Sequence, residues 1–132
     1  MPITLNQIGQ IAVTVDDPDI AERFYGETLG LRKLFRFGNL SFFDCAGVRV
    51  MVDKLEKSEP FKPSSSVIYF RIPDIAIAVR ELKAKGVNFV DSPHLIAPMP
   101  DHDLWMTFFK DPAGNLLALM QEAPKGYQPP TT

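Results

Sequence analysis

Hydrophobic and polar residues alternate along several short stretches of the chain, which is the pattern of β-strands with one buried face. In residues 7–15 the apolar positions of one face are Ile11, Val13 and Val15. The alternation returns in residues 66–72. Further strands are predicted for residues 34–37, 40–44, 48–52, 87–90, 104–110 and 115–121. Strands therefore dominate the predicted structure.

Two helices are predicted, each introduced by an aspartate. Asp17 is suited to cap the first helix, because Pro18 fits the first helical position and the carboxylate can accept free N–H groups. Asp74 stands in the same place before the second helix. Glycines at Gly30 and Gly86 end the two helices.

The chain contains one strand–helix–hairpin unit twice. Residues 13–21 match residues 70–78 at an offset of fifty-seven, while the turn at Ala46-Gly47 matches that at Ala113-Gly114 at an offset of sixty-seven. The second copy thus carries about ten extra residues before its hairpin. We expect one domain over residues 1–132, made of a first unit (5–53), a linker (54–65), a second unit (66–122) and a loosely ordered tail (123–132).

The order β-α-β-β-β in each unit predicts an α+β fold. Each unit should form a curved mixed sheet with one helix on its outer face. The two sheets are expected to surround a trough lined by the faces that no helix covers.

The extra residues, 91–105, hold three prolines, a tryptophan and both histidines of the chain. The prolines predict that residues 91–100 form a stiffened loop rather than a helix or a floppy linker. We expect this loop to form a lid over the trough, with His102 and Trp105 pointing into it. The alternative is a surface loop, in which His94 is exposed and Asp101 caps a turn.

Composition narrows the classes of partner. The formal net charge is −2, and no basic stripe for nucleic acid is present. No run of 18 apolar residues could span a bilayer, and no signal peptide is evident at the start. A single cysteine, Cys45, excludes an internal disulfide and suits the cytoplasm. A small molecule or a protein is the expected partner.

Four segments together resemble the vicinal oxygen chelate superfamily, which includes glyoxalase I, extradiol dioxygenases and bleomycin-resistance proteins. They are residues 11–17, 24–31, 81–87 and 111–115. The resemblance covers the chain from Gln7 to Glu122 and implies the fold described above. It also implies a homodimer. It does not define one activity, because the superfamily hosts several.

The resemblance implies four places for ligands of a divalent ion, at the start of the first strand and in the closing strand of each unit. Here they are occupied by Gln10, Met51, Val67 and Ala118. One amide, one thioether and two apolar side chains cannot replace the carboxylates and imidazoles that such ions need. No metal and no other cofactor is therefore expected.

Eight residues are candidates for contact with a ligand in the trough. They are Gln10, Arg49, Met51, Tyr69, His94, His102, Trp105 and Ala118. Three of them have structural alternatives. Gln10 could instead bond a neighbouring strand, Arg49 could pair with a carboxylate at the edge of its unit, and Tyr69 could belong to the core.

Three functions remain open at this point. The first is a metal-free module that binds a small, partly apolar or aromatic molecule, as antibiotic-sequestering proteins do. The second is a glyoxalase-like lyase or isomerase, or a dioxygenase, with a non-standard metal site. The third is a metal-free enzyme that uses His102 or His94 for acid–base chemistry. The residues do not decide whether a reaction is catalysed.

Overall fold

The computed structural model describes residues 3–54 and 60–130, and the chain divides into two units, residues 1–62 and 63–132. Each unit has its own sheet and its own helix, and each is considered by itself. The predicted linker, residues 54–65, lies in part outside the described residues. No helix in the described ranges is long and apolar enough to cross a membrane.

Unit 1 is a mixed sheet with a helical segment on one face. Its elements are β1 (Gln10–Thr14), α1 (Pro18–Arg23), the π-helical turn η1 (Phe24–Thr28), β2 (Arg32–Phe37), β3 (Leu40–Cys45) and β4 (Val48–Asp53). The strand order is β1-β4-β3-β2, in which β1 and β4 are parallel and the other pairs are antiparallel. This arrangement is the predicted β-α-β-β-β unit.

The residues that begin and end the helical segment of unit 1 behave as the sequence predicts. The Asp17 carboxylate accepts the N–H groups of Asp19 and Ile20 at 3.0 and 3.1 Å, with Pro18 in the first turn. Gly30 has a φ of +79°, a left-handed conformation that follows the helical segment. The side chain of Tyr25 is fully buried near Phe43, with ring centroids 6.4 Å apart. This contact anchors the helical segment on β3.

Unit 2 has the same order of elements as unit 1, except that two short strands stand in the place of one. Its elements are β5 (Ile68–Arg71), α2 (Ile75–Ala84), β6 (Asn88–Phe89), β7 (His94–Pro98), β8 (Asp103–Lys110) and β9 (Leu116–Ala123). The strand order is β5-β9-β8-β6, and β7 also pairs with β8. Because β9 pairs along the whole of β8, β6 and β7 share the opposite edge of β8. Together they take the place that β2 has in unit 1.

The parallel pairing confirms the repeat and the added residues. In unit 1, Gln10 lies beside Arg49, a separation of 39 positions. In unit 2, Ile68 lies beside Leu117, a separation of 49. The ten additional residues form β7 and its flanking turns. The prediction of an irregular loop over residues 91–100 is therefore wrong. Pro98 fits β7 because an edge strand leaves one row of N–H groups unpaired.

The β8–β9 hairpin turns at residues 111–115, as predicted. Gly114 has a φ of +93°, and its N–H donates to the carbonyl of Asp111 at 3.0 Å. The Asn115 amide donates to Asp111 Oδ2 at 2.9 Å and accepts the N–H of Ser64 at 2.6 Å. Asp111 and Asn115 are buried. Their network holds the start of unit 2 against the hairpin.

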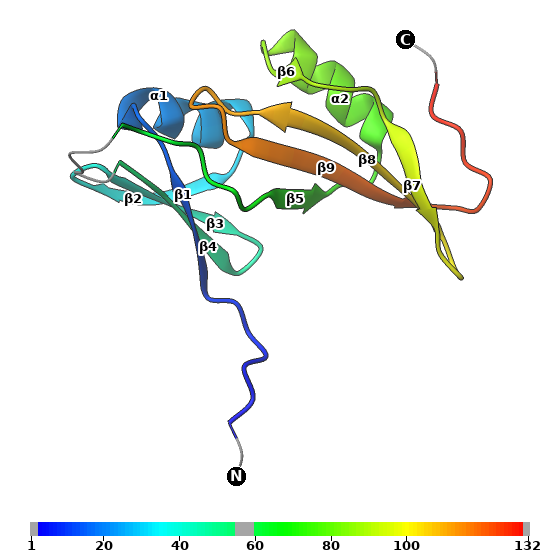
Figure 1. Cartoon of the computed structure of the whole chain (residues 1–132), viewed down its shortest axis with the longest axis horizontal. Coiled ribbons are helices and arrows are strands. Elements are labelled where there is room, and N and C mark those ends of the chain that lie inside the picture. Colours follow the sequence, from blue (N-terminus) through cyan, green and yellow to red (C-terminus); the bar gives the residue numbers. More distant parts are fainter. Residues whose placement is uncertain (1–2, 55–59, 131–132) are drawn as a thin grey trace. The chain divides into compact units, whose positions relative to one another are not determined.

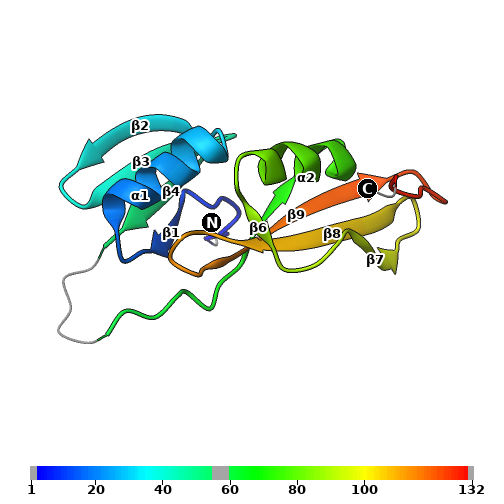
Figure 2. The same ribbon diagram turned by 90° about the horizontal axis from the view of Figure 1, so that it is seen from above.

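Helix α2 packs on one face of its sheet, over β8 and β9 (Figures 1 and 2). The Asp74 carboxylate caps it by accepting the N–H of Ile77 at 3.0 Å. Ile75 and Val79 are buried, as are Phe109 and Leu117 of the strands. Alternate residues of β8 and β9 point to the other face, which α2 does not cover.

The end of the chain is anchored, in contrast to the loosely ordered tail that the sequence predicts. The Gly126 N–H donates to Asp103 Oδ2 at 2.9 Å, and the Lys125 ammonium lies 3.1 Å from Asp103 Oδ1. The ring of Tyr127 meets that of Trp105 edge-on, with centroids 6.0 Å apart. Residues 124–130 are thereby fastened to the start of β8. Residues 131 and 132 lie outside the described ranges.

Candidate functional site

Aromatic side chains surround Ala118 on the uncovered face of unit 2. Strand register places Ala118 between Tyr69 of β5 and Phe108 of β8. The rings of Tyr69 and Phe108 meet edge-on with centroids 6.0 Å apart, and the His94 ring lies 6.4 Å from that of Phe108. Tyr69 is 46% exposed and Ala118 is fully buried. A ligand on this face would meet aromatic rings around a small residue.

Phe108 is the residue of this group that the sequence analysis missed. Its signal was present in the alternation of β8, where Phe108 shares a face with Met106 and so with Ala118 on the neighbouring strand. The imidazole of His94 is exposed, and its Nδ1 lies 2.9 Å from the Ser92 carbonyl oxygen. His94 is thus at the edge of the aromatic group rather than in a loop above it.

The corresponding face of unit 1 brings Gln10 and Met51 together. The Gln10 amide donates to Met51 Sδ at 3.8 Å, which confirms that this glutamine bonds a neighbouring strand. Met51 lies between Ala12 and Phe42 in the sheet. Phe42 in turn stacks on Phe35, with ring centroids 4.5 Å apart. This face also presents sulfur and aromatic surface.

Arg49 lies on the same face, beside Gln10 and opposite Asp44 in the strand register. It is exposed, and no carboxylate among residues 3–54 and 60–130 forms an ion pair with it. Asp44 pairs instead with Arg32, at 3.8 Å. An edge ion pair of Arg49 is thus not found in the described part of the chain, and its guanidinium faces solvent.

The residues at the implied metal positions do not fit a divalent ion. Gln10 and Met51 do converge in unit 1, but they offer an amide and a thioether, and the amide nitrogen is directed at the sulfur. The equivalent places in unit 2 are Val67 and Ala118, which have no donor atom. No group of three or more His, Cys, Asp or Glu side chains suited to a metal occurs within the described residues. Hard and borderline ions need several carboxylates or imidazoles.

His102 lies at the end of the sheet, within a row of charges. Its Nδ1 is 2.7 Å from Asp101 Oδ1, and its Nε2 is 3.6 Å from Glu122 Oε2. Glu122 also accepts a hydrogen bond from Arg71 at 3.0 Å. The contact with His102 holds the pKa of Asp101 below its usual range. Both ring nitrogens face carboxylates, so His102 connects the β7–β8 turn to β9.

Trp105 does not point toward Ala118. The β8–β9 register pairs Trp105 with Gln121, on the face that α2 covers, whereas Ala118 pairs with Phe108 on the other face. The predicted lid, with His102 and Trp105 directed into one space, is therefore wrong. The physical reason is that residues 103–110 form a regular strand, in which Trp105 shares its buried face with Thr107 and Phe109.

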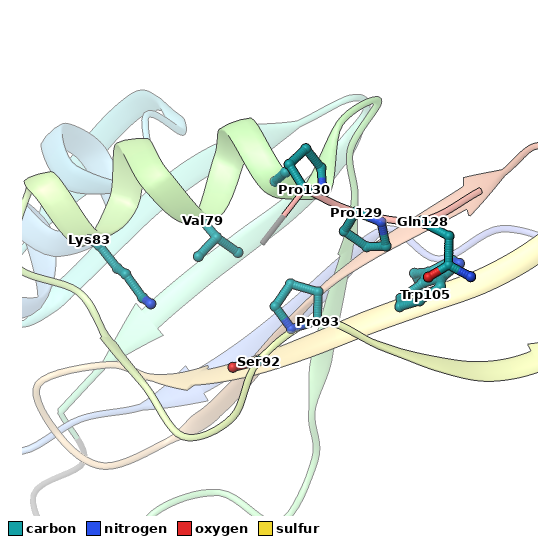
Figure 3. A pocket seen from close by; sticks show the side chains of 9 residues that line it. Val79, Lys83, Ser92, Pro93, Trp105, Gln128, Pro129 and Pro130 are labelled. Atoms are coloured by element: carbon teal, nitrogen blue, oxygen red, sulfur yellow. The ribbon is translucent and has the colours of Figure 1, made fainter. Parts of the chain in front are cut away.

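Trp105 instead lines a cavity of about 330 Å³ between α2 and the sheet (Figure 3). The cavity is bounded by α2, the turn before β7, the start of β8 and the end of the described chain. Its lining residues are Ala76, Val79, Lys83, Ser92, Pro93, Trp105, Gln128, Pro129 and Pro130. The sequence analysis named only Trp105 among them. The others come from segments up to 54 positions apart, and no local pattern connects them.

Residues 7–119 match the family described as the Glyoxalase/Bleomycin resistance protein/Dioxygenase superfamily. No curated protein matches the sequence. Several solved structures share its fold. An integron cassette protein from the mobile metagenome of V. cholerae is 16% identical, with a TM-score of 0.76 over 93% of this chain and 100% of that one.

Two further solved structures extend the comparison. A member of the same superfamily from Sphaerobacter thermophilus is 26% identical, with a TM-score of 0.71 over 89% of this chain and 98% of that one. A lactoylglutathione lyase from Agrobacterium tumefaciens is 21% identical, with a TM-score of 0.68 over 92% and 97% of the two chains.

Proposed function

Because the chain belongs to the Glyoxalase/Bleomycin resistance protein/Dioxygenase superfamily, we propose that it binds a small, partly apolar or aromatic molecule without a metal ion. The molecule is held on the face of the unit 2 sheet that no helix covers. The observation that carries this proposal is the aromatic group of Tyr69 and Phe108 around Ala118. Ala118 occupies a place where metal-dependent relatives are expected to hold a ligand of the ion.

The composition of this face supports binding of an apolar body. Aromatic rings prefer edge-to-face or offset contacts with one another, and such contacts extend naturally to an aromatic ligand. Tyr69 keeps 46% of its surface exposed, and its hydroxyl can bond a polar group of the ligand. Ligand sites in proteins combine such apolar walls with a few polar groups.

A glyoxalase-like or dioxygenase activity receives no support from the residues at the metal positions. Gln10, Met51, Val67 and Ala118 do not form a set of donors for the ion that such chemistry requires. His102 is also a poor base for a substrate, because carboxylates lie at both of its ring nitrogens. We therefore place sequestration or transport of a ligand before catalysis.

His94 provides the one observation that favours a metal-free acid–base enzyme as a second candidate. A carbonyl oxygen only accepts hydrogen bonds, so the Nδ1 that contacts the Ser92 carbonyl carries the proton in the neutral ring. The Nε2 is then the basic nitrogen, next to the ring of Phe108. A reaction that needs one proton acceptor beside an aromatic ligand would fit this geometry.

A homodimer in the cytoplasm remains part of the proposal. The family commonly forms dimers, and the exposed edges of the sheets favour association with another chain. A single cysteine, Cys45, is in keeping with the reducing cytoplasm.

The experiment is a thermal-shift screen of aromatic and aliphatic small molecules on metal-stripped protein, followed by titration of the hits by calorimetry. The Tyr69→Ala variant should bind a hit at least about tenfold more weakly, because one aromatic contact contributes on the order of 1 kcal/mol and burial of the ring adds to it. The matched control is Ile77→Ala. Ile77 is also 46% exposed but lies on α2, on the other side of the sheet.

Equal loss of affinity in both variants, or hits that bind only after a divalent ion is added, would contradict the proposal. Turnover of a hit that disappears in His94→Ala, with binding retained, would establish the second candidate in its place.

A further inference from the structure

The cavity between α2 and the sheet of unit 2 lies on the opposite side of that sheet from the aromatic group around Ala118. Val79 of α2 and Trp105 of β8 lie on facing walls of the cavity. Its volume of about 330 Å³ falls at the lower end of the range for small-molecule sites, about 300 to 1,000 Å³. The space is thus suited to a compact ligand.

The walls of this cavity differ from one end to the other. Figure 3 shows Lys83 and Ser92 toward one end and Trp105 and Gln128 toward the other. Val79 and three prolines, Pro93, Pro129 and Pro130, supply apolar surface between them. Lys83 and Ser92, both exposed at the mouth, thus place a cation and a hydroxyl at one end of a cavity whose middle is apolar. This arrangement matches a molecule with an anionic head and an apolar body.

The charge of Lys83 is not used elsewhere in the described structure. None of the ion pairs formed among residues 3–54 and 60–130 includes it. In Figure 3 the Lys83 side chain extends from α2 in the direction of Ser92. Lysine binds an anion as a compact point charge, and a neighbouring hydroxyl can donate a hydrogen bond to the same anion.

Trp105 adds a buried polar group without a partner to the wall at the other end of the cavity. Its side chain is more than nine-tenths buried, yet its indole Nε1–H has no acceptor in the described part of the chain. Buried donors are nearly always paired, because an unpaired one loses its hydrogen bonds to water without replacement. Gln128 lines the same cavity, and Tyr127 packs on the indole.

We propose that this cavity is a second binding site, for a small carboxylate with an aromatic or branched apolar body. The carboxylate is held by the Lys83 ammonium and the Ser92 hydroxyl. The apolar body lies between Val79 and the prolines and reaches the indole of Trp105. The site is separate from the sheet face and does not depend on the ligand bound there.

The chain has one tryptophan, so indole fluorescence reports directly on this cavity. We would titrate the full-length protein with phenylacetate and, separately, with phenylacetamide, which has nearly the same shape and no charge. Phenylacetate should give a saturable change with a dissociation constant of the order of 1 mM, as expected for about ten non-hydrogen atoms. Phenylacetamide should bind about fivefold to tenfold more weakly.

Lys83→Met removes the charge and keeps the length of the side chain. It should abolish the preference for phenylacetate over phenylacetamide and leave the affinity for the amide nearly unchanged. Lys110→Met is the matched control. Lys110 is an exposed lysine of β8 that does not line the cavity. This variant loses the same charge and should keep the preference.

Three results would overturn the proposal. The first is a fluorescence change that rises linearly with ligand and does not saturate. The second is equal affinity for the acid and the amide in the parent protein. The third is a Lys83→Met variant that binds phenylacetate as the parent does. A melting temperature within about 2 °C of the parent establishes that each variant is folded.

Discussion

Asn115 is the residue of the β8–β9 turn whose replacement tests the structure most directly. Its side chain is almost fully buried, and its hydrogen bonds include one that it accepts and one that it donates. It accepts the Ser64 N–H at 2.6 Å and donates to Asp111 Oδ2 at 2.9 Å. Asn115→Ala removes both bonds. It leaves the half-buried Ser64 N–H without this acceptor and the buried Asp111 carboxylate with one donor fewer.

The size of the effect follows from these two bonds. A neutral hydrogen bond contributes about 1 kcal/mol to the free energy of unfolding, and one to a charged group about 2 kcal/mol. Asn115→Ala should therefore destabilise the protein by about 3 kcal/mol. Asn88→Ala serves as the control, because Asn88 is exposed on β6 in the same unit. A surface change of that kind should cost less than about 0.5 kcal/mol.

Urea unfolding followed by circular dichroism measures both variants. With a slope of about 2 kcal/mol per molar urea, the midpoint of Asn115→Ala should fall by about 1.5 M at unchanged slope. A midpoint indistinguishable from that of Asn88→Ala would refute the argument that this network holds the hairpin and the start of unit 2 together.

Asn115→Asp tests the same network through pH. The new carboxylate would stand beside that of Asp111, and two like charges at hydrogen-bond distance raise the pKa of the pair. The variant should be less stable than Asn115→Ala at neutral pH. Its loss should diminish as pH falls through the raised pKa, because a protonated carboxyl can donate as the amide does. A loss that stays constant from neutral to acidic pH would contradict this reasoning.

Three further predictions concern metal, acid and assembly. Addition of Zn²⁺, Fe²⁺, Mn²⁺ or Ni²⁺ should leave the melting temperature unchanged. An ion that bound the folded protein at a hundred times its Kd would add about 2.7 kcal/mol to the free energy of unfolding. A saturable rise in melting temperature that is lost in Gln10→Ala would disprove the metal-free proposal. The Gly126 N–H and the Lys125 ammonium hold the pKa of Asp103 below its ordinary value of 3.8. The parent should thus be more stable than Asp103→Asn above about pH 4. This difference in stability should vanish as the pH falls through the lowered pKa of Asp103. Melting temperatures of the two proteins that differ equally at all pH values would contradict this prediction. Light scattering should give the mass of a dimer at micromolar concentration, and a monomer throughout that range would exclude the proposed assembly.

Local signals in the sequence were sufficient for most of the fold. Asp17 and Asp74 cap the helices as predicted, since a short carboxylate before a helix can satisfy its free N–H groups. Gly47 and Gly114 adopt the positive φ that the hairpin turns require. The strand β7 was missed because Pro98, together with Pro93 and Pro100 on either side of the strand, disfavours a strand in general. Pro98 is tolerated here at an edge, where residues 95–97 also contain a shift in register.

The positions of the candidate-site residues could be predicted only where these residues follow the two-residue alternation of a strand. Gln10 and Met51 were both named as candidates, and they contact each other because β1 pairs in parallel with β4. The direction of Trp105 was mistaken, although its alternation with Thr107 and Phe109 contained the answer. The cavity under α2 was beyond prediction, since Lys83 and Gln128 become neighbours only through tertiary packing.

The position of β9 in the middle of its sheet has a consequence for synthesis on the ribosome. Unit 1 can complete its sheet once β4 has emerged, at Asp53. Unit 2 cannot, because β9 separates β5 from β8 and begins only at Leu116. During translation both edges of β5 therefore stay without a hydrogen-bonded neighbour while more than forty further residues are added. A nascent chain stalled before Leu116 should hold a folded first unit followed by open strands, and such strands attract chaperones and other nascent chains.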